Sequence, residues 1–317
     1  MTGESSTRAF VLFSSRAGGG GAAQKWSFVR PIVERAFVPI VVEHDDAGLW
    51  RRAVCEALEH GVAVFVAAGG DGTVNALLNA VVGLRGSRAL DALTLGAVGL
   101  GSSNDFHKPF HRLERGIPLT IDLAARRSRD VCRLHFMESA NNGSLSRSRL
   151  FIVSASVGIV ANANAAFNDA AGLQSWLKSR STSAAILYAA TRTILNHRNI
   201  VARLTLDGLA HKAAITNLSI LKTPFVSGSF RFDSPVAPDN GLLSVNLCDG
   251  MTRGEALRTL FDLSHGRFLG RPKRRNWQVA SLAVDATQPF AVELDGEVVT
   301  AARAEFSVLG ERIGVCG

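Results

Sequence analysis

The sequence contains no long hydrophobic run and very little cysteine. No apolar stretch among its 317 residues approaches the length that spans a bilayer, and the start, MTGESSTR, lacks the apolar core of a signal peptide. The four cysteines, Cys55, Cys132, Cys248 and Cys316, are far apart and form no C-x-x-C pair, which argues against a disulfide framework or a zinc site. We therefore expect a cytoplasmic protein with reduced thiols.

The sequence also lacks a recognisable nucleic-acid-binding motif. Its formal net charge of +8 favours a negatively charged partner such as a nucleotide, a nucleic acid or an anionic lipid surface. The aromatic residues are mostly Phe within apolar segments and form no exposed stacking stripe, so we expect no nucleic-acid partner. With 47% hydrophobic and 20% charged residues, the chain is long enough for two domains with separate cores.

The main functional signal is a glycine-rich loop after a buried strand. Val62–Ala68 is short, apolar and rich in β-branched residues, which predicts a parallel strand covered on both faces. Gly69, Gly70, Asp71 and Gly72 follow, and we expect a helix that begins at Thr73 and is capped by it. Glycines let backbone amides approach a phosphate, and the helix dipole favours an anion. Asp71 would repel that phosphate unless a magnesium ion or a hydroxyl lay between them, which points to phosphoryl transfer; the alternative is that Asp71 only caps the helix.

Strands and helices alternate through the rest of the N-terminal part. The expected strands are Ala9–Phe13, Val38–Glu43 and Thr94–Val98, and the expected helices are Ala22–Phe37, Leu49–His60 and Thr73–Val82. This order predicts an α/β domain with a mostly parallel, Rossmann-like sheet, whose ligands collect at the carboxyl ends of the strands.

Two further loops follow strands of this predicted sheet. One consists of Ser14, Ser15, Arg16 and the glycines 18–21, and the other runs from Gly99 to Asp105. In the second loop, Ser102, Asn104 and Asp105 are placed to bind a ligand or to brace the loop at Gly69–Gly72. Glycine runs also serve as flexible connectors, and Asn and Asp also cap helices, so both alternatives stay open.

Beyond Ile117–Leu123 the predicted secondary structure changes from alternating strands and helices to successive strands. We therefore expect a first domain over residues 1–125 and a mainly antiparallel β domain over 126–317, with the extreme C-terminus free to return to the first. The expected strands are Asp130–Met137, Arg149–Val157, Ile200–Asp207, Lys212–Leu221, Leu242–Leu247, Trp277–Val284, Phe290–Leu294 and Ala304–Leu309. Ala161–Asn196 is expected to carry helices near 183–195 and to form a lid, and Asn142-Gly143 and Asp207-Gly208 predict hairpin turns.

A basic segment, HGRFLGRPKRRNW at His265–Trp277, precedes the last strands. Its five cations, Arg267, Arg271, Lys273, Arg274 and Arg275, surround Phe268, Leu269 and Trp277. Interleaved basic and aromatic residues suit an anionic membrane surface, where each cation contributes about 1 kcal/mol near the lipid plane. The alternative is a solvated loop.

Three of these motifs resemble a known family. GGDGTVN at Gly69–Asn75 and GSSNDF at Gly101–Phe106 resemble the paired signature of the diacylglycerol kinase catalytic superfamily, which contains bacterial lipid kinases, sphingosine kinases and ceramide kinases. Asp295-Gly296-Glu297 is similar to the DGE element that completes the active site in these proteins. The chain departs from the family in its first loop, where Ser14-Ser15-Arg16-Ala17-Gly18 replaces Asn-Pro-x-Ser-Gly. It also departs at Gly99, Ser102 and His107-Lys108, which replace Pro, Thr and Ala-Arg.

The resemblance implies an ATP- and Mg²⁺-dependent kinase of lipid metabolism, including phospholipid biosynthesis, that transfers the γ-phosphate to a diacylglycerol- or sphingosine-like hydroxyl. It implies three catalytic residues: Asp71, Glu297 as the base, and Asp122 near the acceptor, although a hinge role for Asp122 stays open. The residues expected to bind the nucleotide are Ser14, Ser15, Arg16, Gly69, Gly70, Gly72, Thr73, Asn75, Gly101, Ser102, Asn104, Asp105 and Asp295.

The resemblance also implies two metal positions and several partners. Asp71 is expected to meet the magnesium of the nucleotide, and Asn240, beside Gly241, is expected at a structural magnesium loop for which a plain turn is the alternative. The expected partners are ATP, a lipid substrate and a peripheral anionic membrane surface, and a homodimer is left open. An NAD kinase-like enzyme also has GGDGT but lacks the NDF loop. A non-catalytic lipid- or nucleotide-binding homologue is the other alternative, against which the retention of Asp71 and Glu297 argues.

Overall fold

The computed structural model describes residues 7–140, 143–168, 188 and 191–317, which fold into two compact units. Unit 1 comprises Met1–Arg129 and Glu311–Gly317, and unit 2 comprises Asp130–Gly310. No helix within the described ranges is both long and apolar enough to cross a membrane.

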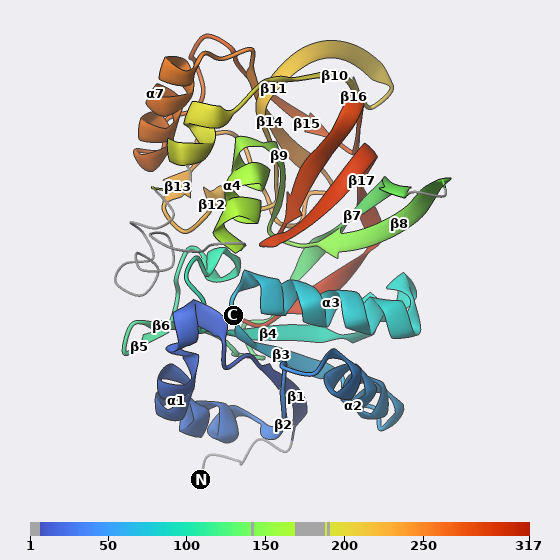
Figure 1. Cartoon of the computed structure of the whole chain (residues 1–317). Coiled ribbons are helices and arrows are strands. Elements are labelled where there is room, and N and C mark those ends of the chain that lie inside the picture. The colour runs from blue at the N-terminus through green and yellow to red at the C-terminus, as the bar shows by residue number, and fades with distance from the viewer. Residues whose placement is uncertain (1–6, 141–142, 169–187, 189–190) are drawn as a thin grey trace. The chain divides into compact units, whose positions relative to one another are not determined.

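Unit 1 alternates strands and helices (Figure 1). Its strands are β1 (Arg8–Phe13), β2 (Val38–Glu43), β3 (Val64–Gly69), β4 (Thr94–Gly99), β5 (Leu113–Glu114) and β6 (Ile117–Thr120). Its helices are α1 (Ala22–Ala36), α2 (Ala47–Glu59) and α3 (Asp71–Arg85), and its short 3-10 turns are η1 (Ala17–Gly20), η2 (Ser87–Ala92) and η3 (Asp105–His107). Short strands without internal polar residues produce this alternation, and β1, β3 and β4 are each followed by a glycine-bearing loop.

Four of these strands form a parallel sheet in the order β4-β3-β1-β2. The end of β17 (Glu297–Val315) adds to β4 in parallel, with Gly314 opposite Thr94, whereas β6 pairs with β4 antiparallel. The strands of unit 2 pair antiparallel, so a mostly parallel sheet describes only this part of the chain.

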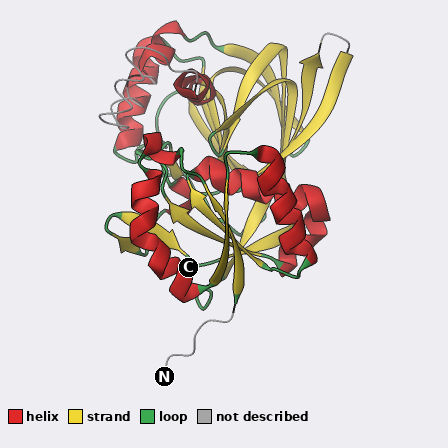
Figure 2. Ribbon diagram, turned by 60° about the horizontal axis from the view of Figure 1, so that its bottom comes forward, coloured by secondary structure: helices red, strands yellow, loops and turns green. Residues whose placement is uncertain are grey.

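Helices cover both faces of the parallel strands, as Figure 2 shows. On one face, Trp26 and Val29 of α1 belong to the same buried cluster as Ala9 and Val11 of β1. On the other face, α3 packs on β3, and α2 contacts α3 and β1. β3 and β4 are consequently buried along their whole length, which explains why they are apolar without alternation.

Unit 2 is mainly β-structure. Its strands are β7 (Arg127–Ala140), β8 (Gly143–Phe151), β9 (Ser154–Gly158), β10 (Ile200–Leu206), β11 (Leu209–Leu221), β12 (Phe225–Val226), β13 (Phe230–Arg231), β14 (Leu243–Asp249), β15 (Arg274–Val279), β16 (Ser281–Leu294) and most of β17. Two of its helices are α4 (Ile159–Asn168) and α7 (Arg253–Ser264). Alternate residues of its strands fill one large apolar core, which includes Leu204, Leu218, Val284 and Phe306.

Antiparallel pairing runs through this unit in the order β15-β14-β11-β10-β16-β17. The predicted turn at Asp207-Gly208 is present, because both residues have positive φ values (45° and 86°) and join β10 to β11 as a hairpin. β11 pairs first with β10 and then with β9, and its pairing with β14 has a bulge between Ile215 and Asn217.

Several predicted elements differ from the observed ones. The single expected strand Arg149–Val157 is divided into β8 and β9, and the expected strands Phe290–Leu294 and Ala304–Leu309 are parts of the long hairpin of β16 and β17. Helix α7 was not expected. The predicted turn at Asn142-Gly143 and the predicted lid and helices of Ala161–Asn196 fall partly outside the described residues, at 142, 169–187 and 189–190.

Candidate active site

The three glycine-bearing loops of unit 1 lie at one edge of its parallel sheet. They follow β1, β3 and β4, whose carboxyl ends point the same way. The amide of Ser14 donates to Ala68 O (2.9 Å), and the amides of Leu100 and Gly101 donate to Gly69 O (2.8 and 3.2 Å). The structure therefore brings together the three loops that the sequence predicts as one site.

Two glycines allow these loops to approach one another closely. A Cβ atom on Gly101 would lie 2.5 Å from the Cα atom of Gly70, and one on Gly18 would lie 2.5 Å from the carbonyl oxygen of Leu100. Gly18 also has a φ of +59°, a conformation that residues with a side chain rarely adopt. The glycine run after β1 forms the turn η1, so it is an ordered part of this edge and not only a connector.

Helix α3 begins two residues earlier than the sequence predicts. Its N-cap is Gly70, in an extended conformation, and Asp71 is its first residue. Thr73 therefore does not cap the helix; it is buried in the first turn, and its amide donates to Gly70 O (2.9 Å). The N-terminus of α3, with its positive dipole end, still lies at the loop edge, as anion binding requires.

Asp71 connects the loop after β3 to the loop after β4. Its Oδ2 accepts a hydrogen bond from the amide of Asp105 (3.1 Å), and its Oδ1 accepts one from the amide of Phe106 (2.9 Å). A carboxylate held by two amides is fixed in position, and such charge-assisted bonds contribute about 1.5–3 kcal/mol each. Asp71 therefore does more than begin a helix, because it joins two loops of the site.

Asn104 shapes the second loop from within. It has a left-handed backbone conformation (φ 51°), and its Oδ1 accepts a hydrogen bond from the amide of Gly101 (3.1 Å). Its Nδ2 donates to the carbonyl oxygens of Gly99 (3.3 Å) and Gly101 (3.2 Å). Asn104 is the N-cap residue of the turn η3, as the cap alternative expects, but its side chain makes no capping hydrogen bond there and bonds the loop instead.

Buried polar side chains that the sequence did not indicate support this loop. Lys108 Nζ donates to Asp105 Oδ1 (2.8 Å), and both side chains are nearly inaccessible to solvent. His107 is buried and its Nδ1 lies 2.7 Å from Thr120 Oγ1. Burial, with a smaller contribution from the positive charge of Arg129, lowers the pKa of His107 to about 3. Lys108 and Asp105 are only three residues apart, whereas His107 and Thr120 are 13 residues apart, and no local spacing pairs them.

The other expected nucleotide-binding residues of unit 1 occupy varied positions. Arg16 is exposed and lies 3.3 Å from Asp45 Oδ1, and Ser15 Oγ donates to Asp45 Oδ2 (3.4 Å). Ser102 is exposed at the loop edge, whereas Asn75 is buried in α3 and accepts hydrogen bonds from Asn79. Asn75 therefore stabilises the helix from inside.

Asp122 lies where the C-terminus joins unit 1. Its amide donates to Gly317 O (3.1 Å), the amide of Gly317 donates to Asp122 O (2.9 Å), and its exposed Oδ1 accepts from the amide of Ala124 (2.9 Å). This geometry is that of a residue in a connection between segments, which favours the hinge interpretation.

In unit 2, the DGE element forms the turn between β16 and β17. The Asp295 carboxylate accepts hydrogen bonds from the amides of Ile152 (2.9 Å), Val153 (3.0 Å) and Ser154 (2.9 Å). This set of bonds explains why the expected strand Arg149–Val157 breaks into two. Asp295 therefore acts on the protein's own backbone, and Glu297, the first residue of β17, is exposed.

Glu293 is a buried carboxylate of the same turn that the sequence did not indicate. Its Oε1 accepts from the amide of Gly296 (2.7 Å), and its Oε2 accepts from Ser156 Oγ (2.8 Å). Glu293 and Asp295 thus hold the turn from both sides, and Glu297 follows it directly. In the sequence, the sign of this role is that Glu293 lies two residues before Asp295 of the DGE element.

Asn240 lies in the turn that precedes β14, at a cluster of oxygen atoms. Its Oδ1 accepts a hydrogen bond from Lys222 Nζ (3.1 Å). Among the described side chains, no group of three or more His, Cys, Asp or Glu residues is arranged to hold a metal ion. The oxygens expected at a structural magnesium are therefore engaged by an ammonium group.

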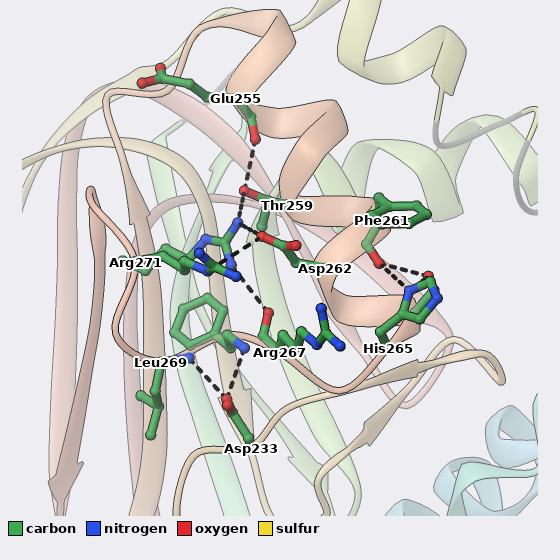
Figure 3. Close-up of polar contacts among 12 residues, drawn as sticks. Asp233, Glu255, Thr259, Phe261, Asp262, His265, Arg267, Leu269 and Arg271 are labelled. Atoms are coloured by element: carbon green, nitrogen blue, oxygen red, sulfur yellow. Dashed lines mark hydrogen bonds and ion pairs between the residues drawn. The ribbon is translucent and has the colours of Figure 1, made fainter.

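The basic segment 265–277 follows helix α7 and folds partly against it, as Figure 3 shows. Arg274 is nearly inaccessible: its guanidinium donates to Asp262 Oδ2 (2.7 Å), Thr259 Oγ1 (3.0 Å) and Arg267 O (3.1 Å). The Arg274 hydrogen bond lowers the pKa of Asp262, although burial opposes the shift. Arg274 is a structural residue, so its expected place in a membrane-binding set is wrong.

Other cations of this segment also face acids. Lys273 Nζ lies 2.7 Å from Glu255 Oε2, and this bond, together with bonds from Thr252, lowers the pKa of Glu255 to about 2. Arg275 lies 3.8 Å from Asp249, and Arg271 lies 4.0 Å from Asp262. Within the described part of the chain, Arg267 alone of the five has no acidic partner for its side chain.

A parallel α/β sheet with glycine loops and a helix N-terminus at its carboxyl edge is an arrangement that can bind phosphate groups. The family described as diacylglycerol kinase catalytic domain matches residues 8–133, and the family described as YegS C-terminal NAD kinase beta sandwich-like domain matches residues 153–317, slightly more than half of the chain. The chain therefore belongs to the diacylglycerol kinase catalytic superfamily, as its motifs predict. General kinase function and the use of a nucleotide follow from this membership.

Solved structures from Bacillus anthracis share the fold. A proposed diacylglycerol kinase aligns with a TM-score of 0.69 at 16% identity, covering 97% of this chain and 96% of its own. A diacylglycerol kinase aligns with a TM-score of 0.64 at 14% identity, with the same coverage. A comparison with curated protein sequences gave no match.

Proposed function

We propose that the protein is an ATP-dependent lipid kinase, which transfers the γ-phosphate of ATP to a hydroxyl of a diacylglycerol- or sphingosine-like lipid. The observation that carries the proposal is the set of three loops at one sheet edge, joined by the Asp71 carboxylate through the amides of Asp105 and Phe106. Phosphoryl transfer asks mainly for positioning and neutralisation of charge, and rigid loops at a helix N-terminus provide both.

In this proposal the loops of unit 1 hold the phosphates. The amides at Gly69–Gly72 and the exposed hydroxyl of Ser102 bind phosphate oxygens, and the α3 dipole stabilises their charge. Asp71 would hold a magnesium ion bound with ATP, because Mg²⁺ prefers carboxylate oxygens, and such an ion would supply neutralisation of the phosphate charge. Asp71 also fixes the positions of the loops after β3 and β4 relative to each other.

Glu297 is proposed as the general base that takes the proton of the attacking lipid hydroxyl. Support comes from the resemblance of Asp295-Gly296-Glu297 to the DGE element and from the geometry of the turn, in which Glu293 and Asp295 are committed to backbone amides. A base must reach the proton that it removes, and Glu297 is exposed at the end of this fixed turn.

The lipid acceptor brings the enzyme to a membrane surface in this proposal. Arg267 and Arg271 are exposed beside Leu269, whose exposed fraction is 41%, and Phe261 on α7 is 64% exposed. Apolar side chains among cations suit an anionic lipid surface. The net charge of +8 adds a long-range attraction to that surface.

The test is ADP production with three acceptors: diacylglycerol, sphingosine and NAD. We expect turnover with at least one of the two lipids and none with NAD. An NAD kinase-like activity is the second candidate, because the family matching residues 153–317 is described as NAD kinase-like. Phosphorylation of NAD alone would establish that candidate, and tight nucleotide binding without turnover of any acceptor would indicate a non-catalytic homologue.

A further inference from the structure

A lysine ammonium is buried in unit 2 among oxygen atoms. Lys222 directly follows β11, and Asp130 lies on β7; both side chains are 1% exposed. A fully buried charge is rare unless it is paired and its hydrogen-bonding capacity is used. The surroundings of Lys222 therefore call for a specific explanation.

All three donors of the ammonium can be assigned. Lys222 Nζ donates to Asp130 Oδ2 (2.8 Å), to Asn240 Oδ1 (3.1 Å) and to the carbonyl oxygen of Leu242 (2.8 Å). A lysine ammonium has three N–H groups, and here each one meets an oxygen of a different chemical type. The group is thus satisfied by a carboxylate, a side-chain amide and a main-chain carbonyl.

The same atoms give the turn at 238–242 its shape. The amide of Gly241 donates to Asp130 Oδ2 (2.7 Å), the amide of Asp130 donates to Pro238 O (2.8 Å), and Gly241 has a φ of +72°. The amide of Leu242 donates to Asn240 Oδ1 (3.1 Å). The turn consequently folds around the ammonium and leads directly into β14.

Carboxylate, amide and carbonyl oxygens are also the ligands of hard metal ions. The atoms around Lys222 therefore form a cation site, but the ammonium lies where its oxygens converge. A metal ion at this position would meet the fixed positive charge of Lys222 and would have to share with it the Asp130 carboxylate, the one carboxylate among the described contacts of the ammonium. The residues present do not fit a structural magnesium ion.

We infer that Lys222 is the built-in cation of the turn at 238–242, so that this part of the fold requires no metal ion. The inference is separate from the proposed kinase activity, because it concerns the stability of unit 2 and not the phosphate loops. It predicts in addition that removal of the ammonium creates a site that an external cation can fill.

The first test uses the unaltered protein without nucleotide. We expect the same thermal and urea unfolding midpoints in EDTA and in Mg²⁺, and no magnesium retained after gel filtration. Stoichiometric retained magnesium, whose removal by EDTA lowers the unfolding midpoint, would overturn the inference.

The second test replaces the lysine. Lys222→Ala should lower the folding equilibrium constant by about 10²-fold or more, because the buried Asp130 carboxylate loses the ammonium group that pairs with it. Methylammonium chloride or MgCl₂, compared with NaCl at equal ionic strength, should restore the midpoint in a saturable way. Lys212→Ala, an exposed lysine on the same strand β11, is the matched control and should show neither effect. Equal midpoints for Lys222→Ala and Lys212→Ala would refute the inference.

A third measurement covers the case in which Lys222→Ala does not fold. Lys222→Met combined with Asp130→Asn removes both charges, so the double variant should be more stable than Lys222→Met alone or should fold where the single variant fails. A double variant that is no more stable than the single one would show that the pairing of charge does not hold this turn.

Discussion

Acid should weaken unit 1 through His107, and the size of the effect follows from the structure. The imidazole is 6% exposed, with Nδ1 2.7 Å from Thr120 Oγ1, in the loop that carries the amides bound by Asp71. Burial, with a smaller contribution from Arg129, lowers the pKa of His107 from 6.5 to about 3. The folded protein therefore keeps this histidine neutral at pH values where an unfolded chain would protonate it.

The sign and the size of the effect follow from linkage. The stabilisation is fully present above pH 6.5 and is lost as the pH falls toward 3, because only the unfolded state takes up the proton in that window. One pKa unit corresponds to about 1.4 kcal/mol, so a fall from pH 7.5 to pH 5 removes about 2 kcal/mol through this residue. Such a loss is a sizeable part of the stability of a typical domain.

Urea unfolding followed by tryptophan fluorescence measures this effect, because Trp26 and Trp50 are buried in the same unit. His107→Gln keeps a hydrogen-bonding group but cannot be protonated, so its loss between pH 7.5 and pH 5 should be about 2 kcal/mol smaller than that of the wild type. His111→Gln, at an exposed position, is the matched control and should behave like the wild type. An identical pH dependence for His107→Gln and the wild type would refute the reasoning.

Three further predictions concern the proposed function. Asp71→Asn should abolish ADP production and lower the free energy of unfolding by about 2 kcal/mol, because the amide group can accept only one of the two hydrogen bonds; normal turnover would contradict its role. Glu297→Gln should lower kcat by about 10²–10⁴-fold and leave ATP affinity in calorimetry unchanged, and an equal loss of affinity would place Glu297 at the nucleotide instead. Arg267→Glu with Arg271→Glu should weaken binding to anionic vesicles in sedimentation, more at low salt than at high salt, whereas Arg52→Glu on α2 should not; unchanged binding would move the membrane contact elsewhere.

The elements of unit 1 could be predicted because their signals are local. The strand at Val38–Glu43 has the predicted bounds, and the strand at Ala9–Phe13 differs from β1 by one residue. Short apolar, β-branched runs indicate strands without help from distant residues, and this holds even for β2, which lies at the end of the strand order and is mostly exposed. The start of α3 was placed two residues late because Gly70 serves as N-cap without a side chain that announces it.

The bounds in unit 2 were harder to predict because distant residues set them. The break between β8 and β9 is held by Asp295, which lies more than a hundred positions away in the chain. Helix α7 is a different case, because Thr252 and Glu255 form a capping box, which is a local signal present in the sequence itself. The break between β8 and β9 depends on tertiary contacts, whereas the start of α7 does not.

The candidate site could likewise be predicted only in part from the sequence. The sequence indicated which loops meet, because parallel strands must end at one edge, but it could not show what holds them together. The bonds from Asp105 and Phe106 to Asp71, and the burial of His107 and Lys108, depend on where the chain passes in space.

The hydrogen bonds of the three acidic residues predicted at the site distinguish Glu297 from Asp71 and Asp295. Asp71 and Asp295 both use their carboxylates to hold main-chain amides, and a carboxylate that gave up such bonds to accept a proton would release the loop that it holds. Glu297 is exposed, and the described part of the chain gives its carboxylate no hydrogen-bond or ion-pair partner. Transfer of a proton to Glu297 therefore disturbs no loop, whereas protonation of Asp71 would weaken the connection between the loops after β3 and β4. This difference supports the proposal that Glu297 is the base, and it gives Asp71 and Asp295 the further role of keeping their loops in place.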